Sequence, residues 1–139
     1  MSWQWLGLQA TARIGRVAID PLAPDRVFVA AMGRQFSTGP DRGLYRSENG
    51  GLDWTRVLFV NDSTGVTDVA INPAHPETVF CATWERVRRP SYRRAYGPGC
   101  GIWRSIDHGD TWTRLSTGLP PPSTTWGGSA SRSRRRARP

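Results

Sequence analysis

The sequence predicts an all-β chain in which a four-stranded antiparallel meander occurs twice. A short motif rich in glycine and in acidic or amide residues occupies positions 47–54 and returns 58 positions later at 105–112. A pair of strand-like segments also occurs twice, around Val17 and, 52 positions later, around Val69. Apolar residues alternate with other residues in these segments, which is typical of strands. Two repeats of roughly 50 residues therefore account for most of the chain.

Residues 105–112 have the composition of a hairpin turn that is held by its own side chains. The Asp107 carboxylate can accept hydrogen bonds from nearby backbone N–H groups, Ser105 can do the same more weakly, and Gly109 tolerates a positive φ. The earlier copy carries the amide of Asn49 in place of the carboxylate, which keeps an acceptor there. The residues with a structural role in the two turns are Ser47, Asn49, Gly51, Trp54, Ser105, Asp107, Gly109, Thr111 and Trp112.

Each repeat supplies four strands. Two are joined by a proline-containing turn, one leads into the hairpin turn, and one leaves it. The second repeat carries six extra residues between its second and third strands, because the offsets of 58 and 52 positions differ by six. The predicted strands are 14–21, 26–31, 43–46 and 54–59 in the first repeat, and 65–73, 78–82, 101–104 and 112–115 in the second.

The pattern Ser-x-Asp-x-Gly-x-Thr-Trp at 105–112 resembles the Asp box of the bacterial neuraminidase repeat, which occurs in sialidase-type, sortilin-type and xyloglucanase-type β-propellers. The resemblance covers residues 3–120, and four antiparallel strands in a repeat of roughly 50 residues fit one propeller blade. A β-sandwich is the alternative, but a sandwich need not repeat its sequence. The resemblance implies about two blades of a larger propeller. It also implies that Asp107 and Asn49 are structural and not catalytic.

We divide the chain into four segments. Residues 1–12 are expected to end a preceding blade with a strand at 3–8, and 13–60 and 61–120 are expected to be one blade each. Residues 121–139 are expected to form a disordered basic tail, and one hypothesis is that a frameshift converted the next blade into it. Propellers close with ~4 to 8 blades. The expected partners are therefore the remaining blades of a parent propeller, or further copies of this chain.

The charge of the chain is concentrated in its tail. All 19 basic residues are arginine, the formal net charge is +8, and five of these arginines stand within 132–138. The rest of the chain is only mildly basic, which disfavours a nucleic-acid partner. No apolar run approaches the ~20 residues of a membrane span, and the first residues lack the pattern of a signal peptide. We expect a cytoplasmic chain as written, with a secreted or periplasmic parent protein as the alternative.

No spacing of histidine, cysteine or acidic residues indicates a metal or a cofactor. His75 and His108 stand in turns, without the spacing of metal ligands. Cys81 and Cys100 flank the expanded loop on strands that are expected to pair. A cross-strand disulfide and two reduced thiols are both compatible with that placement. We therefore predict no metal and no cofactor.

Binding residues are expected on the loops opposite the hairpin turns, because surface loops on a rigid scaffold commonly carry function. These loops are 32–42, 60–65 and the expanded 83–100. In the last loop, aromatic rings alternate with guanidinium groups, which can stack on sugars and pair with carboxylates. The alternative is that Trp84 and Tyr96 pack on the neighbouring blade while the arginines are solvated. An acidic glycan or an acidic peptide is the expected ligand, and the candidate ligand-binding residues are Trp84, Arg86, Arg88, Arg89, Tyr92, Arg93, Arg94 and Asp62.

The sequence thus predicts a structural propeller fragment that contributes to a carbohydrate- or protein-binding surface. The alternative is a portion of a secreted glycoside hydrolase, sialidase-like or xyloglucanase-like, whose catalytic residues lie mostly outside this chain. A glycosidase needs two carboxyl groups ~5 to 9.5 Å apart. No acid on or beside the loops has a catalytic context, so we assign no catalytic residue; these acids are Asp41, Asp62, Asp68 and Glu85.

Overall fold

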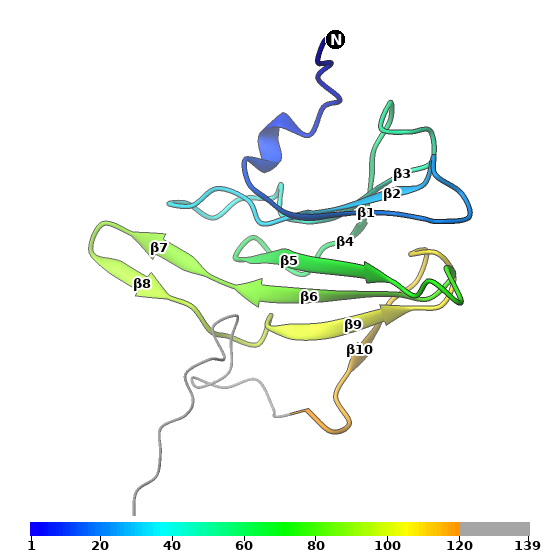
Figure 1. The fold of residues 1–139 in the computed structure, drawn as a ribbon. Coiled ribbons are helices and arrows are strands. Elements are labelled where there is room, and N and C mark those ends of the chain that lie inside the picture. Colours follow the sequence, from blue (N-terminus) through cyan, green and yellow to red (C-terminus); the bar gives the residue numbers. More distant parts are fainter. Residues whose placement is uncertain (120–139) are drawn as a thin grey trace, which may run out of the picture.

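The computed structural model describes residues 1–119, which form two four-stranded antiparallel sheets and a small hairpin (Figure 1). The first sheet holds, in chain order, β1 (Ile14–Ile19), β2 (Val27–Ala31), β3 (Gly43–Ser47) and β4 (Thr55–Leu58). The second holds, again in chain order, β5 (Thr64–Ile71), β6 (Val79–Glu85), β9 (Gly101–Ser105) and β10 (Thr113–Leu115). The hairpin pairs β7 (Val87–Arg89) with β8 (Tyr92–Arg94), and Gln9–Thr11 form a 3-10 helix, η1. The prediction of an all-β fold built from four-stranded antiparallel meanders is confirmed.

The two sheets have equivalent registers. Val17 lies opposite Val29 in the first sheet, and Val69 lies opposite Cys81 in the second. Along β6, buried and half-buried residues alternate over the whole strand. This alternation is expected where the two faces of a sheet meet different surroundings, and it explains why the period-two pattern was readable from the sequence.

The two sheets pack face to face, and a shared core lies between them (Figure 1). Strands β1, β2 and β3 all contact β5. An ion pair of 2.9 Å also joins Arg16 Nε on β1 to Asp68 Oδ1 on β5. Burial of apolar surface in this core holds the sheets together. The core residues include Phe28, Ala30 and Leu44 of the first sheet and Val66, Val69, Val79 and Cys81 of the second.

The two hairpin turns share one hydrogen-bond pattern. Ser105 Oγ donates to Asp107 Oδ1 at 2.6 Å and accepts from the Gly109 N–H at 2.8 Å. Asp107 Oδ1 also accepts from the Thr111 N–H at 2.9 Å. Gly109 has a φ of +95°, a left-handed conformation that favours glycine. The equivalent contacts of the first turn join Ser47, Asn49, Gly51 and Asp53.

Asp107 is predicted to make stability depend on pH. Hydrogen bonds from Ser105 and Thr111 lower the pKa of Asp107 to about 2, and the usual value for this side chain is about 3.9. A carboxylate with a lowered folded-state pKa stabilises the fold above its unfolded-state pKa. That contribution disappears as pH falls through the folded-state pKa. We therefore expect the free energy of unfolding, measured in urea at each pH, to decline between about pH 4 and about pH 2.

Asp107→Asn is the matched variant, because the first turn already carries an amide, Asn49, at the equivalent place. The variant should fold and should lack the part of the decline that Asp107 contributes. An identical decline in the variant and in the unaltered chain would mean that other carboxylates account for it, and would contradict the assignment.

Residues 3–8 differ from the prediction, because they form no strand. A strand needs a neighbour for its backbone hydrogen bonds, and no strand among the described residues pairs with this segment. The segment lies instead beside the first hairpin turn, where the Leu6 carbonyl accepts a hydrogen bond from Trp54 Nε1 at 2.8 Å. Trp3 and Trp5 are exposed.

The hairpin turns and the expanded loop lie at opposite ends of the sheets (Figure 1). Strand β6 continues to Glu85, three residues beyond the predicted end, and β7 and β8 extend past it. The stretch 83–100, which was predicted as a loop, therefore contains a two-stranded hairpin. Its place at the loop end of the sheets makes it the most prominent candidate for a binding element.

Candidate ligand-binding site

The candidate site is the hairpin β7–β8, which projects from the end of the second sheet (Figure 1). Pro90 and Ser91 form its two-residue connection, where proline favours a turn because its ring fixes φ. Val87 is buried and anchors the first strand. The remaining strand positions carry mostly arginine. The cross-strand pairs are Val87 with Arg94, Arg88 with Arg93, and Arg89 with Tyr92.

The base of the hairpin is held by the buried carboxylate of Glu85. Its Oε1 accepts a hydrogen bond from Arg94 Nη2 at 2.6 Å, and its Oε2 accepts one from the Gly99 N–H at 2.8 Å. A Cβ at Gly97 would clash with the carboxylate, so glycine is required there for Glu85 to fit. Glu85 thus joins β8 to the segment that precedes β9, and it is a structural anchor.

A second anchor, Arg42, was not predicted from the sequence. Its guanidinium group is buried, and burial lowers the pKa of Arg42. In the sequence repeat, the equivalent of Arg42 is Cys100, so comparison of the two copies gave no signal. The guanidinium joins the loops on this side of the sheets to the start of the hairpin. It donates hydrogen bonds of 2.8 to 3.2 Å to the backbone carbonyls of Arg34, Ser37, Ser63 and Arg86.

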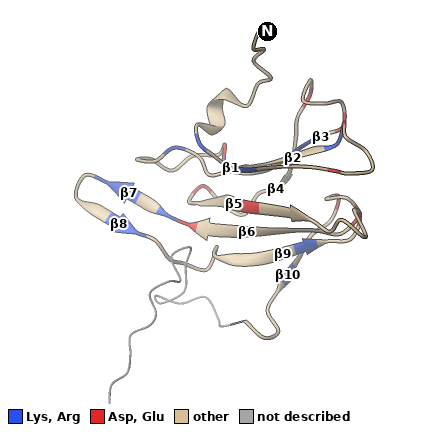
Figure 2. Cartoon of the chain, viewed as in Figure 1, with Lys and Arg blue, Asp and Glu red and all other residues tan. Residues whose placement is uncertain are grey.

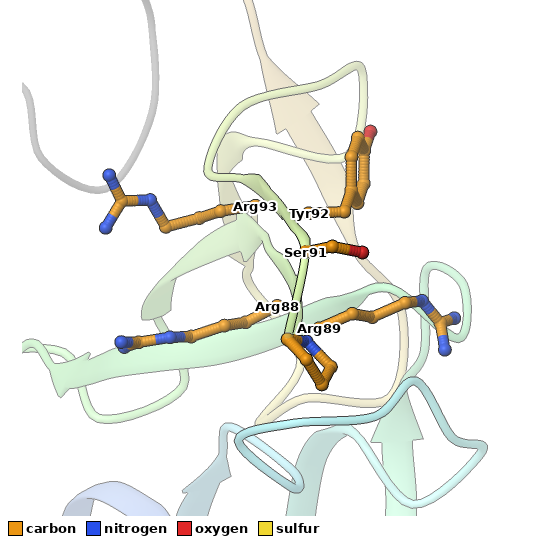
Figure 3. Close-up of a pocket in the computed structure, with 6 residues that line it drawn as sticks. Arg88, Arg89, Ser91, Tyr92 and Arg93 are labelled. Atoms are coloured by element: carbon orange, nitrogen blue, oxygen red, sulfur yellow. The ribbon is translucent and has the colours of Figure 1, made fainter.

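The tip of the hairpin carries a shallow hollow of about 360 Å³ (Figure 3). Arg88 and Arg93, which lie opposite each other in the two strands, extend to the same side, whereas Tyr92 extends to the other (Figure 3). Arg88 also lies over the ring of Phe36, with 5.4 Å between Cζ and the ring centroid. The hollow is lined by Arg88, Arg89, Pro90, Ser91, Tyr92 and Arg93.

Arginine is concentrated on this hairpin (Figure 2). Like charges on directly opposite strand residues repel each other and destabilise the pair, and Arg88 and Arg93 are such residues. Neither forms an ion pair within residues 1–119, whereas Arg94 is paired with Glu85. Burial, together with nearby arginines that include Arg88 and Arg93, lowers the pKa of Arg86. The hairpin therefore presents a local excess of positive charge, which attracts anions.

The structure brings half of the predicted binding residues together and separates the others. Trp84 and Arg86 lie at the base of the hairpin, with 5.2 Å between Arg86 Cζ and the Trp84 ring centroid. Arg94 is engaged by Glu85. Asp62 is exposed on the loop between β4 and β5 and does not line the hollow. The predicted residues that share the hollow are Arg88, Arg89, Tyr92 and Arg93.

The two cysteines are free thiols. Cys81 lies opposite Trp103 across β6 and β9, and burial raises the pKa of Cys81 to about 12. Cys100 Sγ accepts a hydrogen bond from the Glu85 N–H. Of the two alternatives that the sequence left open, the structure has the reduced thiols.

Among the described residues, no three or more His, Cys, Asp or Glu side chains cluster closely enough to hold a metal ion. Within residues 1–119 there is also no helix with the length and apolar character needed to cross a membrane.

Comparison with known proteins finds similarity in fold. No family model matches the chain, and no curated protein matches it. Among solved structures, an ancestral GH74 enzyme matches 81% of this chain and 13% of its own, with 20% identity and a TM-score of 0.59. A GH74 enzyme from Niastella koreensis matches 73% of this chain and 22% of its own, with 15% identity and a TM-score of 0.42.

The chain thus spans only 13% of the ancestral enzyme. GH74 enzymes are β-propeller proteins, and the four-stranded antiparallel sheets described above have the fold of part of one. At 20% identity the likeness shows the fold alone. The all-β, propeller-type architecture predicted from the sequence repeat is therefore confirmed.

Proposed function

We propose that this chain is part of a larger, glycoside-hydrolase-like β-propeller with Asp-box hairpins at 47–54 and 105–112. In this proposal, hairpin β7–β8 forms part of a surface that binds an acidic carbohydrate. The likeness in fold to a GH74 enzyme supports the first part. The arginines that line the hollow support the second. An acidic peptide presents the same carboxylates and is the competing ligand.

One observation carries the proposal. Arg88 and Arg93 lie directly opposite each other on β7 and β8, and neither has an acidic partner within residues 1–119. Their repulsion costs stability, and the fold gains no ion pair in return. A carboxylate bound between them would remove the repulsion, because guanidinium groups bind such anions with paired N–H donors. Tyr92 extends to the other side of the hairpin (Figure 3), so we assign this binding to the two arginines and not to the tyrosine ring.

Catalysis by the longer protein is a second candidate, favoured by the likeness to a GH74 enzyme. Asp62 is exposed at the loop end of the sheets. A glycosidase needs a second carboxyl group ~5 to 9.5 Å from the first. Glu85 is buried and engaged by Arg94 and Gly99, so it is not available for that role. Asp41, on the neighbouring loop between β2 and β3, is half-buried, so the second carboxyl group would be Asp41 or a residue outside the described part of the chain.

Calorimetric titration with an oligogalacturonate, a carboxylated oligosaccharide, tests the proposed binding. Arg93→Gln should weaken binding about tenfold, because a hydrogen bond to a charged group contributes about 1.5 kcal/mol. Added salt should weaken binding further by screening. A neutral xyloglucan oligosaccharide should bind at least about tenfold more weakly than the carboxylated one.

Arg104→Gln is the matched control, since Arg104 is an exposed arginine on β9 and the variant has the same net charge. Both variants keep the arginines of 132–138, so a difference between them reports on the hairpin. Equal weakening by the two variants would mean that binding follows net charge alone, and would contradict the proposal. Tighter binding of a polyglutamate peptide than of the oligogalacturonate would make an acidic peptide the ligand.

A further inference from the structure

The second sheet has a face that no strand or hairpin turn of residues 1–119 covers, and it is equivalent to the covered face of the first sheet. In the first sheet, Phe28 on β2 lies opposite Arg46 on β3. In the second sheet, Phe80 on β6 lies opposite Arg104 on β9 in the same register. The first pair packs against the second sheet. The second pair faces away from the first sheet, because successive sheets stack in the same orientation.

The covered face shows what such a pair contacts when a neighbour is seated on it. Arg46 Nη1 donates a hydrogen bond of 2.8 Å to the His108 carbonyl and forms an ion pair of 2.7 Å with Asp110 Oδ1. The Phe28 ring lies so close to the hairpin turn that a Cβ built on Gly109 would be 2.9 Å from Phe28 Cε1. Phe28 is 0% exposed as a result. The neighbour thus contributes a carbonyl, a glycine and a carboxylate in three successive residues.

The equivalent residues of the second sheet lack these contacts within residues 1–119. Phe80 is only half-buried, although Phe28 at the equivalent place is fully buried. Arg104 is exposed and has no carboxylate partner in the described part of the chain, although Arg46 has two, in Glu48 and Asp110. This face therefore has the apolar residue and the charge of a docking surface, without the hairpin turn that fits them.

The first sheet of a second copy of the chain does not match this surface. Its hairpin turn has Leu52 where the second turn has Asp110, so it offers Arg104 no carboxylate at that place. The space over its glycine is also occupied, because a Cβ on Gly51 would be 2.9 Å from Leu6 Cδ1. Leu6 takes the place on the first turn that Phe28 takes on the second. The matching occupant carries Gly-Asp in its hairpin turn, and no side chain of its own occupies the space over that glycine.

We propose that the face around Phe80 and Arg104 is the docking surface for a further blade whose hairpin presents a backbone carbonyl followed by Gly-Asp. The carbonyl and the carboxylate bind the Arg104 guanidinium, and the glycine admits the Phe80 ring. This inference rests on the part of the proposed function that places the chain in a larger propeller. Beyond that proposal, it names the face that binds the next blade, the arginine that recognises this blade, and the residues that the blade must present.

The test supplies such a partner by extending the chain with a copy of its own second blade. Residues 59–119 are joined after Ser116, which preserves the register because Ser116 is the equivalent of Leu58. Native-state hydrogen exchange then reports the protection of the strand amides in the added blade. Arg104→Gln should lower these protection factors about tenfold, as expected for loss of a charge-assisted hydrogen bond. The same substitution in the unextended chain should change protection of β6 and β9 less than about twofold.

Replacement of the added copy's equivalent of Asp110 by Asn should also lower protection. Combined with Arg104→Gln it should add little, because the two groups interact with each other. An added blade without protection, or protection that is indifferent to Arg104, would overturn the proposal. So would a dimer of the unextended chain that Arg104→Gln abolishes, because the occupant would then be a second copy. Carbohydrate binding is measured separately on the unextended chain, so failure of one proposal is distinguishable from failure of the other.

Discussion

Phe28→Ala is expected to lower the free energy of unfolding by about 3 to 5 kcal/mol, the usual cost of truncating a buried phenylalanine. Phe28 is 0% exposed and lies in the core that the two sheets share. Its ring also fills the space over Gly109, so truncation leaves a cavity between the first sheet and the second hairpin turn. Domains of this size have only about 5 to 15 kcal/mol of stability. Urea unfolding should therefore show a midpoint that is strongly reduced.

Phe80→Ala is the matched control for this prediction. Phe80 has the same place in the second sheet but is only half-buried. Its truncation should cost about 1 kcal/mol, since less apolar surface is returned to water. Equal costs for the two variants would contradict the conclusion that the sheets pack face to face through Phe28.

Glu85→Ala is expected to lower the free energy of unfolding by about 3 kcal/mol. The substitution removes the buried acceptor of the Gly99 N–H and the partner of Arg94. A buried N–H without an acceptor costs about 1 to 3 kcal/mol, and removal of one member of a buried ion pair adds to that cost. The Arg94 side chain is 32% exposed, so water compensates it in part. Urea unfolding measures the loss, and hydrogen exchange should show faster exchange at Gly99.

Glu85→Gln separates the charge from the hydrogen bond. Its side-chain carbonyl can still accept from the Gly99 N–H, so it should cost about half as much as Glu85→Ala. If Glu85→Ala left both stability and exchange at Gly99 unchanged, Glu85 would not be the anchor of the hairpin.

The sheets were predictable for two reasons. Their sequence occurs twice in the chain, and the two faces of a sheet meet different surroundings, which produces a period-two pattern of burial. Val17 and Val69 mark equivalent strands, and they lie opposite equivalent residues, Val29 on β2 and Cys81 on β6. The hairpin turns were recognisable because their hydrogen bonds are local. Ser105 and Asp107 bind backbone groups within four residues, so the sequence contains all of the partners.

The arginine-rich hairpin β7–β8 was not predictable in the same way. Only Val87 is buried within β7 and β8, so no apolar alternation marks the two strands. Arg42 binds carbonyls as far away as Arg86, and such contacts leave no local pattern. Residues 3–8 showed the pattern of a strand but have no neighbouring strand among the described residues. The differences at Arg42 and at residues 3–8 arise where structure depends on contacts that are distant in the sequence, whereas the hairpin was missed because its strands carry only one buried apolar residue.

The most direct test of the proposed binding surface is to map the backbone amide chemical shifts of the chain during titration with the oligogalacturonate. The account predicts perturbations at 88–93 and at Phe36, which lies beneath Arg88, with little change at the two hairpin turns. Perturbations confined to residues 120–139 or to the hairpin turns, with β7 and β8 unchanged, would contradict the assignment of the arginine-rich hairpin as the binding surface.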